Sequence, residues 1–400
     1  MSAIISALRD GAWLTWERVQ RWSWTVLALT IAFVIFLGSS AHGPVDFMGR
    51  PLGTDFSAFY AAGRLVLAGA DPYDQAALHH VEQALFGTGV PYYGFAYPPV
   101  FLLVAVPLAA LPYFVALILW QGASFTAYLW AMNLVRRGFA SPLPTGTFLL
   151  AAAAFSAVVV NIGHGQNGFL TAALFGIALA MLDRRPWMAG FCFALLAYKP
   201  QMAILIPFAL GAGGRWRTFI AAAITLGILI AATIPFFGVE SWAAFWGATQ
   251  LWRHIILDQG RVGYEKMASI FAWMRLWHAP LAAAYAVQGV ASITVLIGVV
   301  RTWQMPVDAR LKGAALCAGA IVATPFALDY DLMLMAPAIA LMAAHGREKR
   351  FAPYEAAVLA LMWIAPLLNR PLAGTLFLPI ATWCAIALFV FACRRTFTTA

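Results

Sequence analysis

Asp55 is the residue whose surroundings most favour acid–base chemistry. It follows the first long apolar segment of the chain and stands beside aromatic residues such as Phe56. A carboxylate that is partly removed from water can serve as a general base. The alternative is that Asp55 caps a helix beginning near Ser57. Residue types alone leave both interpretations open.

A second polar segment, residues 161–168, joins two apolar stretches and reads Asn-Ile-Gly-His-Gly-Gln-Asn-Gly. Its glycines allow backbone N–H groups to approach a ligand closely. The side chains of Gln166 and Asn167 carry amides that suit sugar hydroxyls. The alternative is a plain hairpin turn, and His164 by itself does not distinguish the two.

Lys199 precedes Pro200 in the middle of the apolar stretch 187–212. Proline frees a backbone carbonyl from its helical donor, and a lysine at membrane depth needs an anionic partner. A lipid phosphate would meet that need. The alternatives are an aspartate elsewhere in the protein or a side chain that extends to the membrane interface.

Asp329 and Asp331 form an Asp-x-Asp pair close to the end of another apolar stretch. Paired carboxylates of this kind occur in metal sites. The spacing is also common in helix caps and salt bridges, for which Lys199 is a candidate partner. The sequence therefore leaves metal binding, capping and ion pairing open for these two residues.

The composition requires that these residues be positioned by helices in a membrane. Of the 400 residues, 63% are hydrophobic and only 10% are charged, whereas soluble domains contain about 25% charged residues. Several stretches reach the roughly 20 apolar residues that cross a bilayer, and no long alternating strands occur. We expect an all-α, polytopic helical bundle of about 11–13 transmembrane helices. The stretches that meet the length requirement most clearly are 23–41, 218–237, 281–300 and 375–393.

Polar stretches divide this single predicted domain, residues 1–400, into loops and helices. Residues 1–21 are predicted to form a cytoplasmic amphipathic segment on the membrane surface. Residues 42–97 form the first large outer loop, with two amphipathic helices at 57–68 and 75–86 that we expect on the outer membrane surface. A second outer loop covers 238–280.

Two apolar stretches have ambiguous numbers of crossings. Residues 98–135 contain a break at 110–112, and residues 187–212 are interrupted at Lys199. Near the end of the chain, the pattern predicts separate helices at 353–368 and 371–393.

The net charge of +9 resides largely in short basic flanks of the apolar stretches, including Arg136-Arg137 and Arg394-Arg395. This is the positive-inside pattern of membrane proteins and not a nucleic-acid-binding surface. When the rule chooses the topology, one group of residues converges on the outer side: Asp55, Gln166, Lys199 and Asp329.

Taken in order, these motifs resemble glycosyltransferase family 87, a family of C-type membrane enzymes that includes polyprenyl-phosphate-mannose-dependent mannosyltransferases. The resemblance covers about residues 22–345 and places Asp329-Tyr330 where a His-Tyr pair often stands in the family. It is carried by residues 55–62, residues 69–74, Tyr97-Pro98-Pro99, Gly165-Gln166-Asn167 and Lys199-Pro200.

The resemblance implies that Asp55 deprotonates an acceptor hydroxyl, which attacks a sugar on a polyprenyl-phosphate donor with inversion. It implies that Lys199 neutralises the phosphate and that Gln166 and Asn167 position the sugar or phosphate. Two further residues are expected to contact the donor, His164 and Tyr60. Additional candidates are Asp329, Asp331, Tyr97 and Arg64.

The resemblance also implies a compartment and a set of partners. We expect a multi-pass protein of the bacterial inner membrane whose active site faces the periplasm. Its partners are the polyprenyl-phosphate-linked sugar, a lipid or glycan acceptor and membrane lipids, with no nucleic acid, no cofactor and no required metal. A transporter or flippase of lipid-linked or small substrates is the alternative function.

Overall fold

The computed structural model describes residues 2–139 and 144–398, and within them the secondary structure is helical with no β-strand. Five helices are long and apolar enough to cross a membrane, and a bent pair, α7 and α8, would make a sixth. The expected number of about 11–13 counted each apolar stretch as a crossing, but several of these stretches contain only short apolar helices. The five long helices are α2 (Trp16–Ser39), α6 (Tyr113–Gly138), α13 (Trp216–Phe237), α16 (Leu281–Gln304) and α19 (Glu355–Leu376).

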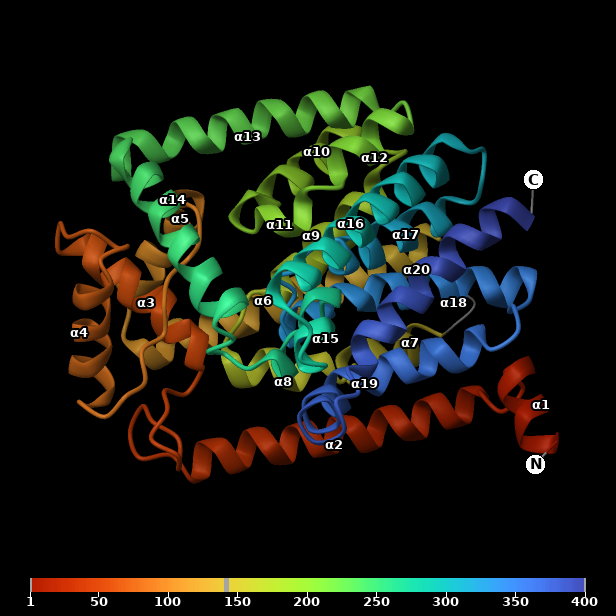
Figure 1. The fold of residues 1–400 in the computed structure, drawn as a ribbon, viewed down its shortest axis with the longest axis horizontal. Coiled ribbons are helices and arrows are strands. Elements are labelled where there is room, and N and C mark those ends of the chain that lie inside the picture. The colour runs from red at the N-terminus through yellow and green to blue at the C-terminus, as the bar shows by residue number, and fades with distance from the viewer. Residues whose placement is uncertain (1, 140–143, 399–400) are drawn as a thin grey trace.

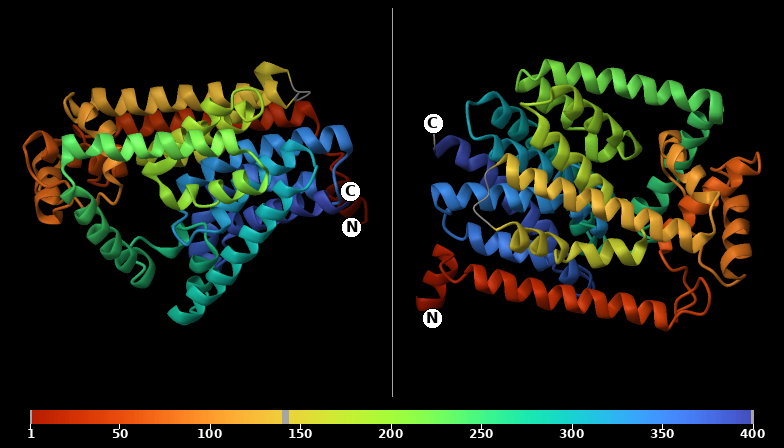
Figure 2. Two further views of the ribbon diagram at one scale, coloured as in Figure 1. Left: turned by 90° about the horizontal axis from the view of Figure 1, so that it is seen from above. Right: turned by 180° about the vertical axis from the view of Figure 1, so that it is seen from behind.

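Helices α2, α6, α13 and α19 run roughly along the longest dimension of the molecule, whereas α16 runs obliquely to them (Figures 1 and 2). Helix α2 and helix α13 form opposite edges in Figure 1, and many of their apolar side chains are exposed, as expected for surfaces that face lipid. Both chain termini lie at one end of the bundle, whereas α3 (Thr54–Leu67) and α4 (Gln75–Phe86) lie at the other.

The first large loop contains the two expected helices, but one of them is buried. Helix α4 has the predicted bounds and is capped by Asp74, whose carboxylate accepts from Ala76 N at 2.9 Å. Helix α3 was expected on the membrane surface, yet most of its side chains are buried. It packs so closely on α5 (Pro99–Ala109) that a Cβ at Gly63 would lie 2.4 Å from the Ala105 carbonyl oxygen.

The two stretches with ambiguous numbers of crossings, 98–135 and 187–212, each begin with a short helix and continue with at least one more helix. The first breaks at residues 110–112, as predicted, between α5 and the span-length α6. The second contains α10 (Pro186–Leu195), a 3-10 turn (Leu196–Tyr198), α11 (Pro200–Ala203) and α12 (Ile206–Ala212). Lys199 therefore lies at a break between short helices.

Two separate helices are present near the end of the chain, as predicted, but the break between them lies later than the predicted position at residues 369–370. Helix α19 continues to Leu376 although it contains Pro366 and Pro371. A proline inside a helix removes one hydrogen bond without necessarily ending it. The Asn369 side chain stabilises the helix from outside, since it donates to Glu265 O and accepts from Ala381 N in α20 (Ile380–Thr398).

The remaining helices complete the bundle. Their bounds are α1 (Ser2–Asp10), α7 (Thr145–Ala153), α8 (Ala157–His164), α9 (Gly168–Met181), α14 (Glu240–Arg253), α15 (Ile270–Leu276), α17 (Ala309–Val322) and α18 (Met335–Lys349), with a 3-10 segment at Asp329–Leu334 before α18.

Candidate active site

Asp55 lies in the first turn of α3 and does not cap it. The N-cap is Gly53, whose φ of +72° glycine adopts without strain, and no side chain caps this end. The capping interpretation of Asp55 was therefore wrong, because the helix begins three residues earlier than the sequence pattern indicates. The carboxylate is favoured at a helix N-terminus, and its side chain is 27% exposed.

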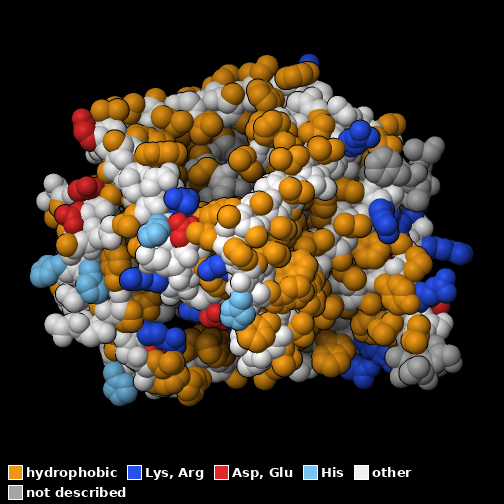
Figure 3. Space-filling view, viewed as in Figure 1, with side chains coloured by type: hydrophobic (Ala, Val, Ile, Leu, Met, Phe, Trp, Pro, Cys, Tyr) orange, Lys and Arg blue, Asp and Glu red, His pale blue; other side chains and the backbone are white. Residues whose placement is uncertain are grey.

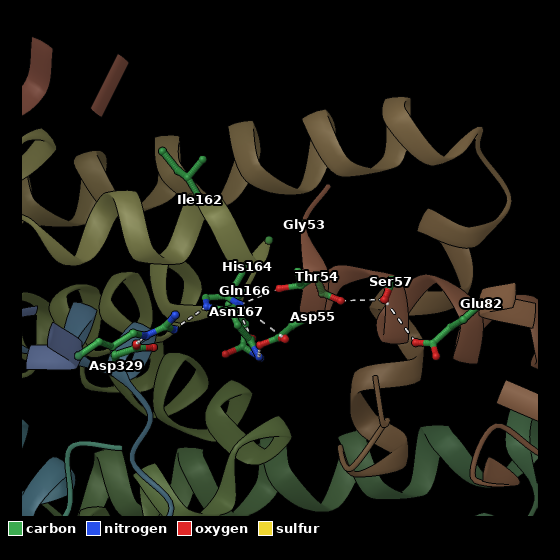
Figure 4. Close-up of polar contacts among 12 residues, drawn as sticks. Gly53, Thr54, Asp55, Ser57, Glu82, Ile162, His164, Gln166, Asn167 and Asp329 are labelled. Atoms are coloured by element: carbon green, nitrogen blue, oxygen red, sulfur yellow. Dashed lines mark hydrogen bonds and ion pairs between the residues drawn. The ribbon is translucent and has the colours of Figure 1, made fainter. Parts of the chain in front are cut away.

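His164, the last residue of α8, lies beside Asp55 (Figure 4). Its Nδ1 is 3.7 Å from Asp55 Oδ1 and 2.7 Å from Thr54 Oγ1. On the other side of the ring, Nε2 is 2.7 Å from Nη2 of Arg370 in α19. The ring thus joins the start of α3 to the C-terminal third of α19.

The contact with Arg370 determines the tautomer of His164. A guanidinium group has only donors, so Nε2 must accept the hydrogen bond and carry no proton. The proton of the neutral imidazole is then on Nδ1, where it faces Thr54 Oγ1 and Asp55.

Gln166 connects Asp55 with Tyr97. Its Nε2 donates to Asp55 Oδ2 at 3.3 Å. The Tyr97 hydroxyl lies 3.0 Å from Nε2 and 3.2 Å from Oε1 of the same amide. Its Oε1 also accepts from the backbone N–H of Asn167 at 2.7 Å. Both ends of the Gln166 amide are therefore held by hydrogen bonds. The amide presents an N–H to the carboxylate of Asp55, which is partly exposed.

Asn167 and Asp331 hold Lys199 from two sides. The ammonium group donates to Asn167 Oδ1 at 3.0 Å and forms a close ion pair with Asp331. It also lies over the Tyr330 ring, 4.9 Å from the centroid. Lys199 and Asp331 are both buried, so the aspartate supplies the charge that the lysine needs inside the protein.

Asp329 is buried and forms a second ion pair, with Arg370, whose side chain is 36% exposed. The two carboxylates of the Asp-x-Asp motif thus face different cations, which is the salt-bridge interpretation of the motif. Within residues 2–139 and 144–398, no cluster of three or more His, Cys, Asp or Glu side chains is arranged around a common point.

Two buried polar atoms in this group have no hydrogen-bond partner among the described residues. They are Nδ2 of Asn167 and Oδ1 of Asp329, and both side chains are fully buried. Buried polar groups are nearly always paired in native proteins. Unpaired atoms beside a partly exposed carboxylate are therefore consistent with a site that completes its hydrogen bonds when it binds a ligand.

The 161–168 turn depends on two glycines. Gly165 has φ of +64°, and a Cβ there would lie 2.7 Å from that of Phe56. At Gly168 a Cβ would lie 2.4 Å from the Tyr330 carbonyl oxygen. We expected these glycines to let a ligand approach the backbone closely. In the structure they let other segments of the protein pack closely against the turn.

The environment of Asp55 keeps its carboxyl group ionised. Burial raises its pKa, but the His164 ring, the Gln166 amide and the Arg370 guanidinium lower it, and the balance places the pKa below the ordinary value of an aspartate. Asp55 is therefore able to accept a proton at neutral pH, although it is not a strong base.

Tyr60 and Arg64 lie on α3 with Asp55 but are not brought to this group. Tyr60 donates to Leu111 O at 2.8 Å, and its ring packs against Tyr113 with centroids 5.2 Å apart. Arg64 is exposed, nine residues along the helix from Asp55 or about 13 Å at 1.5 Å per residue. Residues on one helix point in different directions, so Tyr60 and Arg64 do not share the surroundings of Asp55.

Arg370 and Thr54 belong to the group but were absent from the sequence prediction. Arg370 falls between the two helices predicted at 353–368 and 371–393. An arginine inside an apolar stretch is itself a signal of function at membrane depth, and the same reasoning that identified Lys199 would have identified it.

Comparison with protein families matches residues 95–337 to glycosyltransferase family 87. Comparison with curated proteins finds no match. The matched region contains Tyr97, the 161–168 turn, Lys199 and both aspartates of the Asp-x-Asp motif, whereas Asp55 and Arg370 lie outside it. Because the match covers more than half of the chain, this multi-pass membrane protein belongs to glycosyltransferase family 87.

Proposed function

We propose that the protein transfers a sugar from a polyprenyl-phosphate donor to a hydroxyl of a lipid or glycan acceptor, with Asp55 as the general base. One observation carries this proposal. Of the three carboxylates in the group, Asp55 is 27% exposed and has no close cation pair, whereas Asp329 and Asp331 are buried in ion pairs. Asp55 is thus the carboxylate that an acceptor hydroxyl can reach.

The proposed step is a single displacement. The Asp55 carboxylate takes the proton of the acceptor hydroxyl as its oxygen attacks the anomeric carbon. A new carbon–oxygen bond forms while the bond from that carbon to the phosphate oxygen breaks, and polyprenyl phosphate leaves with the bonding electrons. Attack opposite the leaving group inverts the anomeric configuration. The enzyme supplies orientation and charge stabilisation, which suffice for a phosphate leaving group.

The leaving phosphate gains negative charge, which the cations of the site would stabilise. Arg370 is 36% exposed at its side chain, and a guanidinium group suits phosphate oxygens, whereas Lys199 is only 3% exposed. We place Arg370 next to the phosphate, with Lys199 behind it. Lys199 would act on the donor through Asn167, whose unpaired Nδ2 is free to donate to the phosphate or sugar.

The orientation in the membrane follows from the distribution of charge. The end of the bundle that carries the termini is rich in Lys and Arg, whereas acidic and His side chains gather toward the α3 and α4 end (Figure 3). Under the positive-inside rule this distribution supports the proposal that the terminal end faces the cytoplasm and the Asp55 group faces the periplasmic side of a bacterial inner membrane. A polyprenyl donor would enter from the bilayer.

The donor class and the stereochemistry test this function directly. The purified protein would be given polyprenyl-phosphate mannose, other polyprenyl-phosphate hexoses and pentoses, and a nucleotide sugar, each with a membrane-lipid extract as acceptor. We expect a glycosylated product from a polyprenyl-phosphate sugar alone, with inverted anomeric configuration by NMR. Transfer from the nucleotide sugar, or retention, would contradict the mechanism. Movement of intact donor across a vesicle membrane without product would instead support the transporter alternative.

A further inference from the structure

A cavity lies at the opposite end of the bundle from Asp55, where the chain termini are. Its volume is about 680 Å³, and it lies between the N-terminal segment and the connection from α18 to α19. Its charged lining residues are Arg9, Asp10, Arg347 and Arg350, and Trp16 contributes an aromatic wall.

The N-terminal segment is fixed in place and so gives the cavity a defined shape. Tyr354 N donates to Arg9 O at 2.9 Å, and this contact attaches α1 to the start of α19. Gly11 has φ of +68°, and a Cβ there would lie 2.5 Å from the Ala356 Cβ. Only glycine therefore allows the chain to pass this close to α19 before α2 begins.

Arg347, near the end of α18, lines the cavity and contacts the N-terminal segment. Its guanidinium lies over the Trp16 ring, 3.5 Å from the centroid, and donates to Leu14 O at 3.3 Å. A cation–π contact orients a guanidinium while leaving its edge available to an anion.

The cavity has an excess of positive charge. Three arginines line it against a single carboxylate, Asp10, which accepts a hydrogen bond from Ser6. In the part of the chain that the structure describes, none of Arg9, Arg347 and Arg350 forms an ion pair with a carboxylate. Cations gathered around one concavity produce a field that attracts an anion.

The cavity lies close to the level of the lipid headgroups. Trp22 and Trp24 are exposed on α2 at the start of its apolar, lipid-facing surface, and tryptophan is enriched at membrane interfaces. Trp16 precedes Trp22 by six residues, or about 9 Å along the helix. The headgroup layer on each side of the hydrocarbon is about 5–8 Å thick, so the arginines lie at or just beyond it.

We propose that this cavity binds the phosphate of an anionic membrane lipid, with Arg9, Arg347 and Arg350 as its ligands. Basic pockets at the cytoplasmic end of membrane helices suit anionic headgroups. The site lies outside the residues that match the glycosyltransferase family, 95–337, and does not depend on the proposed reaction. It would anchor α1 and the start of α19, the helix that carries Arg370, to one leaflet.

Retention of lipid by the full-length protein tests the site. Protein in detergent would be titrated with phosphatidylglycerol, phosphatidylethanolamine or inorganic phosphate, and bound lipid would be followed by native mass spectrometry and by thermal stabilisation. We expect retention and stabilisation with phosphatidylglycerol. Equal retention of phosphatidylethanolamine would overturn the preference for an anionic lipid, and equal stabilisation by inorganic phosphate would overturn the lipid source.

Matched triple variants distinguish lipid binding at this cavity from nonspecific attraction of anionic lipid to exposed arginines. In Arg9→Gln/Arg347→Gln/Arg350→Gln, we expect phosphatidylglycerol binding to weaken roughly 100-fold. In the control, Arg137→Gln/Arg184→Gln/Arg217→Gln, three exposed arginines outside the cavity are replaced and binding should persist. Equal losses in both variants would overturn the proposal. If the first variant does not fold, Arg350→Gln alone should still weaken binding, and wild-type affinity there would be the contradictory result.

Discussion

Arg370 donates a hydrogen bond to Nε2 of His164 at 2.7 Å, although 206 positions of sequence separate the two residues. This contact determines the protonation of the ring, because arginine cannot accept a hydrogen bond. It also connects α19 to the base of the proposed reaction, since the opposite ring nitrogen faces Thr54 and Asp55.

Replacing His164 should change the pH dependence of transfer. Burial raises the pKa of Asp55, and His164 is the main group that lowers it. The ionised base is present above that lowered pKa and is lost as the pH falls through it. In His164→Asn the pKa of Asp55 should rise, so the acid limb of kcat/KM should move to higher pH.

The control for this change is His80→Asn, an exposed histidine on α4. It should leave the acid limb where it is in wild type. An acid limb that is the same in His164→Asn and wild type would show that the ring does not act on Asp55.

The Lys199–Asp331 pair should separate stability from function. Asp331→Asn leaves a buried cation without its charge partner and should destabilise the protein by about 3–5 kcal/mol. The double variant Lys199→Met/Asp331→Asn removes both charges and should regain most of that stability. If Lys199 acts on the donor phosphate, the double variant should stay inactive. Thermal unfolding measures the stability of each variant, and sugar transfer measures its activity. Full activity in the double variant would assign Lys199 a structural role alone.

Gly168→Ala should damage the turn between α8 and α9. The new Cβ would lie 2.4 Å from the Tyr330 carbonyl oxygen and 2.6 Å from Asn161 Oδ1, which accepts from Gly168 N. We expect a loss of about 1–3 kcal/mol from overpacking and a loss of transfer, because Gln166 and Asn167 would shift. Gly122→Ala in α6 is the matched control, since its Cβ would meet open space. Equal unfolding temperatures for the two variants would contradict this account.

Glu82 should make the stability of the first large loop depend on pH. Its carboxyl group is fully buried against Ser57 and Tyr93 N, and burial raises its pKa to about 8. Between the ordinary pKa near 4.5 and about 8, the unfolded chain is ionised while the folded protein holds the proton, so stability falls as the pH rises through this range.

Glu82→Gln is the matched variant, because a neutral amide does not titrate. Its unfolding temperature should change less than that of wild type between pH 5 and pH 8, with hydrogen exchange reporting on α4. A wild-type stability that rises across the same range would contradict the assignment.

The sequence predicted the elements whose signals are local. The break at 110–112, the bounds of α4 and the interruption at Lys199 follow from proline and from apolar periodicity. The convergence of Asp55, Gln166, Lys199 and Asp329 followed from topology, because the positive-inside rule placed all four at one end. In the structure, hydrogen bonds of His164, Gln166 and Asn167 connect these four residues.

Other features depended on packing that the sequence pattern does not contain. Arg370 was missed because it fell between two predicted helices, whereas α19 continues through it and the Asn369 side chain bonds to Glu265 O and Ala381 N. Helix α3 has the periodicity of a surface helix, yet Gly63 allows it to pack inside the bundle. The choice between a phosphate and an aspartate as the partner of Lys199 needed the position of Asp331, 132 residues away.

The most direct test of the central claim compares wild type with Asp55→Asn, using a polyprenyl-phosphate sugar as donor. General-base catalysis contributes about 100- to 10,000-fold to a rate, so we predict a loss of that size with donor affinity unchanged. Asp71→Asn, which replaces an exposed aspartate of the same loop, is the control and should keep full turnover. Equal turnover in Asp55→Asn and wild type would contradict the assignment of Asp55 as the base.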